Sequence, residues 1–151
     1  MRVNQKKAHQ KYGGSIYKQC LSLCIISASS IMIRSQLIED IGFFDESLLA
    51  CEDYDYWLRL SSKYSIHLME ESLMTKRAGH DDQLSYQFKA MDRFRIKGML
   101  KMLESRELNE KDYHDTVQML IFKCQVLITG CRKRNKTKET EYYQSIIHRY
   151  S

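Results

Sequence analysis

The second half of the chain carries apolar residues at helical spacing over most of its length. One set runs from Phe88 to Leu103 and a second from Val117 to Ile128, with members mostly three or four positions apart. Such spacing places apolar side chains on one face of a helix. A third helix is expected from about Lys138 to Tyr150. The sequence therefore predicts that helices fill the second half, so any β-sheet belongs to the first half.

Short strands and short helices are mixed in the first half. The sequence predicts helices at 15–21, 35–41 and 52–62, and β-strands at 25–26, 30–33, 65–69 and 73–76. In the third helix, Asp55 and Arg59 stand one turn apart and are expected to pair. A complete parallel sheet needs several crossover units of about 30 residues each, and these do not fit before Asp53. We therefore expect an α/β fold of which this chain is the latter part.

The composition is that of a soluble globular protein. Of the 151 residues, 43% are hydrophobic and 28% are charged. The longest apolar stretch, from Leu23 to Ile33, is broken by serines and is shorter than the roughly 20 residues of a membrane span. The basic start has no apolar region behind it, as a secretory signal would have. Five cysteines at irregular spacing give no disulfide pattern, so we expect a cytoplasmic protein with reduced thiols.

Charge is distributed unevenly along the chain. Residues 1–36 carry six basic and no acidic groups, 37–104 carry nine and thirteen, and 105–151 carry nine and six. An acidic centre between basic ends suits a site that holds a cation or activates a hydroxyl, although plain solvated surface explains it too. The basic cluster within 132–138 is consistent with docking to a partner or an anionic membrane, or with a solvated helix end. No nucleic-acid partner is expected, because no recognition motif is present.

Seven carboxylates lie between Glu39 and Asp55 without an intervening lysine or arginine. Two of them, Glu52 and Asp53, fall at the expected start of a helix. There they could act as structural caps, since helix N-termini stabilise negative charge. They could also supply a general base that takes a proton from an attacking hydroxyl. The sequence leaves both roles open.

A histidine beside two aspartates forms the other candidate constellation. His80 follows a glycine and precedes Asp81 and Asp82. Imidazole and carboxylate groups bind divalent cations, and the histidine could alternatively be an exposed loop residue. Asp53-Tyr54-Asp55 also has an Asp-x-Asp spacing, but residues two apart on a helix do not share a face.

The order of these motifs carries a family resemblance. The segment CIISASSIMIRSQLIEDIGFFDESLLACEDYDYWLRLS, followed by GHDDQLS and MDRFRI, resembles the C-terminal half of a bacterial family 2 glycosyltransferase with the glycosyltransferase-A fold. The resemblance implies that residues 1–104 are the acceptor-side part of that Rossmann-like domain, and that residues 105–151 are a helical extension. It also implies that the nucleotide-binding half, with its metal-binding Asp-x-Asp, is missing from this chain.

The resemblance further implies a reaction and its residues. A sugar would pass from a nucleotide-sugar donor to a hydroxyl acceptor, saccharide or lipid-linked, with inversion. Asp53 would be the catalytic base with Glu52 as its neighbour, and His80 would help to hold a Mg²⁺ or Mn²⁺ ion and the nucleotide diphosphate. Activity of this chain alone is left open, and a position peripheral to the inner membrane is consistent with such acceptors. The alternative is a non-catalytic remnant or interaction module that docks a partner or a membrane surface.

Overall fold

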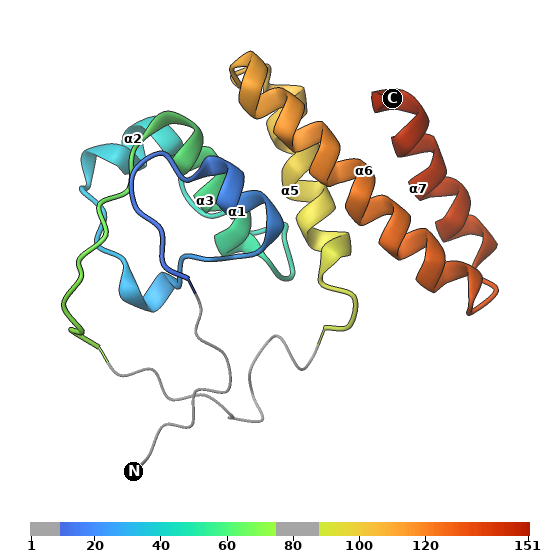
Figure 1. Cartoon of the computed structure of the whole chain (residues 1–151), viewed down its shortest axis with the longest axis horizontal. Coiled ribbons are helices and arrows are strands. Elements are labelled where there is room, and N and C mark those ends of the chain that lie inside the picture. Colours follow the sequence, from blue (N-terminus) through green and yellow to red (C-terminus); the bar gives the residue numbers. More distant parts are fainter. Residues whose placement is uncertain (1–9, 75–87) are drawn as a thin grey trace, which may run out of the picture.

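The structure, a computed structural model, describes residues 10–74 and 88–151. Helices dominate these residues (Figure 1). In chain order they are α1 (Tyr17–Ser22), the short 3₁₀ helix η1 (Ala28–Ser30), α2 (Gln36–Ile41), α3 (Glu52–Lys63), α5 (Asp92–Ser105), α6 (Glu110–Arg132) and α7 (Thr137–Tyr150). None of the helices in the described ranges is both long and apolar enough to cross a membrane.

The predicted α/β fold is wrong for the part of the chain that the structure describes. Residues 10–74 and 88–151 contain no strand, and their β-pairing is limited to an isolated antiparallel bridge between Gly14 and Ile66. This part is therefore not a Rossmann-like glycosyltransferase-A domain. The strand expected at 73–76 falls partly outside the described residues.

The failed strands have a physical explanation in packing. Isoleucines at 26, 31 and 33 lie against a cluster of buried side chains that includes Trp57 and Leu60 of α3. Their neighbours Ala28–Ser30 form a 3₁₀ turn instead of extended chain. A β-branched run indicates burial against an apolar surface, and here that surface is a helix and not a sheet.

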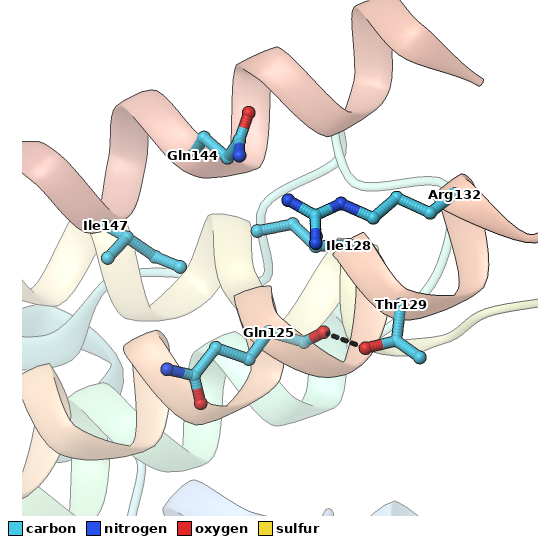
Figure 2. Close-up of a pocket in the computed structure, with 6 residues that line it drawn as sticks. All are labelled: Gln125, Ile128, Thr129, Arg132, Gln144 and Ile147. Carbon is cyan, nitrogen blue, oxygen red and sulfur yellow. Dashed lines mark hydrogen bonds between the residues drawn. The ribbon is translucent and has the colours of Figure 1, made fainter. Parts of the chain in front are cut away.

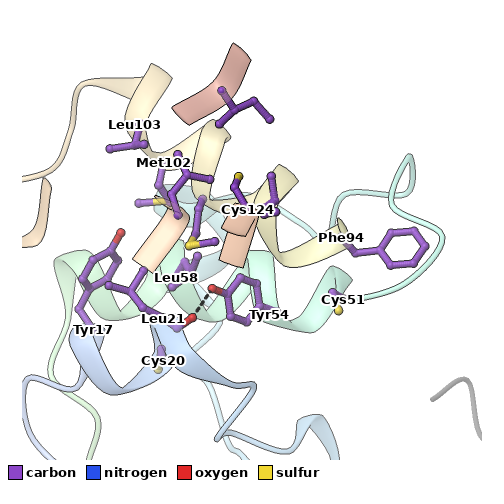
Figure 3. Packing of buried hydrophobic residues seen from close by; sticks show 14 of the residues in the cluster. Tyr17, Cys20, Leu21, Cys51, Tyr54, Leu58, Phe94, Met102, Leu103 and Cys124 are labelled. Atoms are coloured by element: carbon purple, nitrogen blue, oxygen red, sulfur yellow. Dashed lines mark hydrogen bonds between the residues drawn. The ribbon is translucent and has the colours of Figure 1, made fainter. Parts of the chain in front are cut away.

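Helix α3 lies at the centre of the molecule. Its Tyr54 and Leu58 enter the main core with residues of α1, α5 and α6 (Figure 3). On its other side, Tyr56, Trp57 and Leu60 form a smaller cluster with Ile41 of α2. The Tyr54 hydroxyl donates a buried hydrogen bond of 2.7 Å to the Leu21 carbonyl. Burial on two sides therefore fixes the direction in which the start of α3 points.

The remaining helices pack along α3 and one another. Helix α5 packs across α3, with Cys51 beside Met91 at the two helix starts and Asp55 beside Lys101 further along α5. Helix α6 runs antiparallel to α5, since Lys123 in its second half pairs with Asp92 at the start of α5. Helices α6 and α7 form an antiparallel hairpin that buries Ile128 and Ile146.

Candidate functional site

The start of α3 places the Glu52-Asp53 pair where a helix favours negative charge. Glu52, Asp53 and Asp55 all lie in its first turn. The residue before the helix, Cys51, has a left-handed backbone with φ of 63°, so the chain turns sharply into α3. Unpaired N–H groups at a helix start carry partial positive charge and stabilise carboxylates within the first turn. The predicted helix start is confirmed.

Two hydrogen bonds orient the Asp53 carboxylate. Its Oδ1 accepts from the backbone N–H of Tyr54 at 2.7 Å, and its Oδ2 accepts from the Cys24 thiol at 3.2 Å. The side chain is half-buried, and no basic residue in the described ranges forms an ion pair with it. Asp53 is thus a positioned carboxylate that retains access to solvent.

Cys24 is a residue of this site that sequence reasoning missed. Burial, and then the negative charge of Asp53, raise the pKa of its thiol well above the ordinary value. The thiol therefore stays protonated at neutral pH and can donate to Asp53. No spacing in the sequence connects two residues 29 positions apart, so only the packing of the segment after α1 against α3 reveals this contact.

Asp55 has the opposite surroundings from Asp53. It is 1% exposed, and its Oδ2 lies 3.0 Å from a guanidinium nitrogen of Arg59, which confirms the predicted i,i+4 pair. Its Oδ1 lies 2.8 Å from Lys101 Nζ of α5. Both carboxylate oxygens of Asp55 therefore lie beside protein cations, so the Asp-x-Asp spacing does not present two carboxylates to one ligand.

The ion pair of Asp55 continues into the turn before α3. Lys101 also lies 2.6 Å from Asp45, and the Lys101 and Ser47 hydrogen bonds hold the pKa of Asp45 well below its usual range. Arg59 donates to the backbone carbonyls of Ile41 and Phe43. These contacts fasten the turn that follows α2 to α3 and α5, and so support the helix start that carries Asp53.

A metal centre is not visible among the described residues. Within 10–74 and 88–151, no three His, Cys, Asp or Glu side chains gather closely enough to hold an ion. The predicted ligand His80 lies outside the described residues, together with Asp81 and Asp82. The residues at hand therefore do not fit a Mg²⁺ or Mn²⁺ ion, and no catalytic step is derived through one.

Two hollows on the described surface lie away from Asp53. One, of about 360 Å³, lies between α6 and α7, and Figure 2 shows the Arg132 guanidinium over Ile128 inside it. The other, of about 240 Å³, lies between α1, the end of α3 and the start of α6, and contains Lys18, Lys63 and Lys111. Neither of these two includes Glu52 or Asp53 in its lining.

Comparison with known proteins links the chain to glycosyltransferases. It is 32% identical over 83 residues to an uncharacterized glycosyltransferase of Rickettsia typhi, and the aligned segment covers 55% of this chain and 25% of that protein. It is also 32% identical over 59 residues to one of Rickettsia felis, covering 39% of this chain and 10% of that protein. No protein-family model and no solved structure matches the chain.

These matches support a glycosyltransferase relationship and no finer assignment. The aligned segments make up a quarter or less of each curated relative. Asp53 and Glu52 lie together in the first turn of α3, as predicted, while their catalytic roles stay predictions. The domain boundary at residue 104 and the role of His80 likewise stay predictions.

Proposed function

We propose that these residues belong to an inverting glycosyltransferase of family 2, which transfers a sugar from a nucleotide-sugar donor to a hydroxyl acceptor. The similarity to two proteins named glycosyltransferase supports the reaction class. The observation that carries the proposal is the Asp53 carboxylate, which is held by two donors at the start of α3 and lacks an ion-pair partner among the described residues.

In this proposal Asp53 acts as the general base. The acceptor hydroxyl oxygen attacks the anomeric carbon of the donor sugar, and its proton passes to the Asp53 carboxylate. The new bond forms as the bond between the anomeric carbon and the diphosphate oxygen breaks, and the electron pair leaves with the diphosphate. Attack opposite the leaving group inverts the configuration. A base in this position contributes about 10² to 10⁴-fold in rate.

The neighbouring carboxylates suit other roles. Asp55 already compensates Arg59 and Lys101, so protonating it would break a buried ion pair. Glu52 precedes Asp53 in the same turn and adds negative charge near the acceptor. The family resemblance also predicts donor binding by a nucleotide-binding half that this chain lacks, and a Mg²⁺ or Mn²⁺ ion held with the help of His80. Both remain predictions.

Three isosteric variants test the base assignment in the longest natural polypeptide that contains these residues. Release of nucleoside diphosphate is measured over a panel of nucleotide-sugars and acceptors. We expect Asp53→Asn to lose about 10² to 10⁴-fold in turnover with an unchanged melting temperature. Glu52→Gln should retain more activity, because the base itself remains.

Asp55→Asn is the matched control for damage to the fold. It should lower the free energy of unfolding by about 2 to 4 kcal/mol, below the figure for a fully buried pair because the Lys101 side chain is 40% exposed. Asp53→Asn turnover at the parental rate would overturn the assignment of the base. Absence of turnover in the parental polypeptide over the whole panel would instead favour the non-catalytic alternative.

A further inference from the structure

The turn between α6 and α7 concentrates positive charge at the end of a helical hairpin. Five basic residues stand within seven positions and are all exposed: Arg132, Lys133, Arg134, Lys136 and Lys138. Asn135 in the middle has a left-handed backbone with φ of 54°, which makes the turn tight. Only two carboxylates follow closely, Glu139 and Glu141. We call residues 132–138 the hairpin tip.

Helix stability accounts for only part of this charge. Basic groups at the end of α6 complement the negative pole of that helix. Arg132 stands in its last turn, and the Arg134 guanidinium donates to the Gly130 carbonyl. Lys136 and Lys138 stand at the start of α7, where a cation opposes the helix dipole. Glu139 compensates Lys136 at 2.9 Å, but no ion pair of Lys138 is found among the described residues. The helix dipole therefore gives no reason for placing these two lysines at the start of α7.

An exposed apolar stripe on α6 leads to the hairpin tip. Phe122 is 58% exposed and Val126 is 47% exposed. With Lys133 they are spaced by four and seven positions, which places all three on one face of the helix. The opposite side of α6 carries Leu120, Cys124 and Ile128 into the core. Exposed apolar groups aligned with a basic cluster are typical of a helix that lies on a membrane surface.

The hairpin tip projects from the end of the molecule that also carries Asp53. Lys123 of α6 pairs with Asp92 at the start of α5, and α6 continues for nine further residues, about 14 Å, to Arg132. Figure 1 shows the turn that joins the end of α6 to α7. The start of α5 lies beside the start of α3, where Cys51 contacts the Met91 carbonyl. The hairpin tip and the start of α3 that carries Asp53 therefore lie toward the same end of α5.

We propose that the hairpin tip and the stripe of Phe122 and Val126 dock the protein on an anionic phospholipid bilayer. The lysines would lie against lipid phosphates and the apolar pair against the boundary of the acyl chains. Nucleic acid is the other polyanion to consider. Val126 offers it no stacking surface, whereas a bilayer takes up aliphatic and aromatic side chains alike.

Vesicle sedimentation of the 151-residue chain tests the proposal. Phosphatidylcholine vesicles are compared with vesicles that also contain phosphatidylglycerol, at low and high salt. The wild type should bind only the anionic vesicles, and more weakly as salt rises. The triple variant Lys133→Gln/Lys136→Gln/Lys138→Gln should bind about 100-fold more weakly, because each basic residue near the surface contributes about fivefold. Phe122→Ala should lose about tenfold at both salt concentrations.

The matched control removes three exposed basic residues elsewhere, as Lys97→Gln/Arg106→Gln/Lys111→Gln. It should bind within a few-fold of the wild type, and the tip variant should melt no lower than the wild type. Equal losses in both triple variants would overturn the proposal, because net charge alone would then explain binding. Failure of the wild type to bind anionic vesicles would overturn it too, as would tighter, tip-dependent binding to an oligonucleotide. Asp53→Asn should bind vesicles normally, so this test is independent of the proposed reaction.

Discussion

At the scale of single residues, the surroundings of a carboxylate decide what it can do. Asp53 and Asp55 are separated by one residue in the first turn of α3. Successive helical positions rotate by about 100°, so the two side chains point to different faces. One meets a thiol and partly faces solvent, and the other meets two cations in the core.

The contact between Cys24 and Asp53 predicts a change in thiol reactivity. Burial and the charge of Asp53 both raise the pKa of Cys24, so Asp53→Asn should lower that pKa and increase the thiolate fraction at any given pH. Alkylation of Cys24 by iodoacetamide, followed by mass spectrometry at mildly alkaline pH, should then be severalfold faster. Glu52→Gln is the control, because its charge does not act directly on Cys24. Equal rates in Asp53→Asn and the wild type would contradict this contact.

The candidate site shows what sequence can predict at this scale. Glu52 and Asp53 were identified because a helix start follows an acidic run, and that information is local. Other contacts of the site join residues that are 29 to 56 positions apart. Cys24 contacts Asp53, and Lys101 pairs with Asp45 and Asp55. Such contacts depend on how helices pack, which periodicity alone does not specify.

At the scale of elements, helices with strong apolar periodicity were predicted well. The structure confirms helices near 15–21, 35–41, 52–62 and over the three long segments of the second half. Helix α2 ends at Gly42 as expected, because φ of 81° there suits glycine and its N–H bonds to the Ile38 carbonyl. Ser35 stands just before this helix, but its side chain makes no capping hydrogen bond. The strands expected from short apolar runs are absent from the described residues, because such runs indicate burial against either a helix or a sheet.

Where α3 and α5 cross, Gly98 of α5 lies against Tyr54 and Asp55 of α3. A Cβ built on Gly98 would lie 3.4 Å from the Tyr54 ring and 3.7 Å from Asp55 Cα, which are ordinary contacts. Gly98→Ala should therefore raise the free energy of unfolding by about 0.5 to 1 kcal/mol through helix propensity. Gly98→Val, whose branches would enter the ring, should lower it by about 1 to 3 kcal/mol. Urea denaturation measures both, and destabilisation by alanine would show that α3 and α5 pack more tightly than described.

At the scale of the whole molecule, the acidic centre of the sequence becomes a set of separate ion pairs. Asp40 lies 3.8 Å from Lys63, Asp45 pairs with Lys101, and Asp55 pairs with Arg59 and Lys101. The basic partners lie in α3 and α5, and Lys101 of α5 is far from the acidic run in the sequence. Packing thus pairs three of the seven carboxylates of this run with basic side chains, and Asp53 is among those that form no ion pair within the described residues.

A buried lysine makes global stability depend on pH. Lys123 is 5% exposed and joins three helices, because its Nζ donates to the Ser22 carbonyl at 2.9 Å and to Asp92 at 2.8 Å. Burial acts to raise the pKa of Asp92, but the hydrogen bonds from Lys123 and Arg95 outweigh it and the pKa is lowered. A carboxyl with a lowered pKa in the folded state contributes stability above its unfolded pKa, near 4, and loses it as pH falls through the folded pKa.

Replacing that lysine should therefore matter most at neutral pH. Lys123→Met keeps the apolar stem but removes the charge, so we expect the free energy of unfolding at pH 7 to fall by about 2 kcal/mol. The difference from the wild type should shrink as pH falls from about 5 to about 2, because protonated Asp92 no longer gains from the lysine. Lys97→Met on the exposed side of α5 should give a small difference that does not change with pH. A constant difference for Lys123→Met would show that its contribution comes from packing and the Ser22 carbonyl, and not from the charge of Asp92.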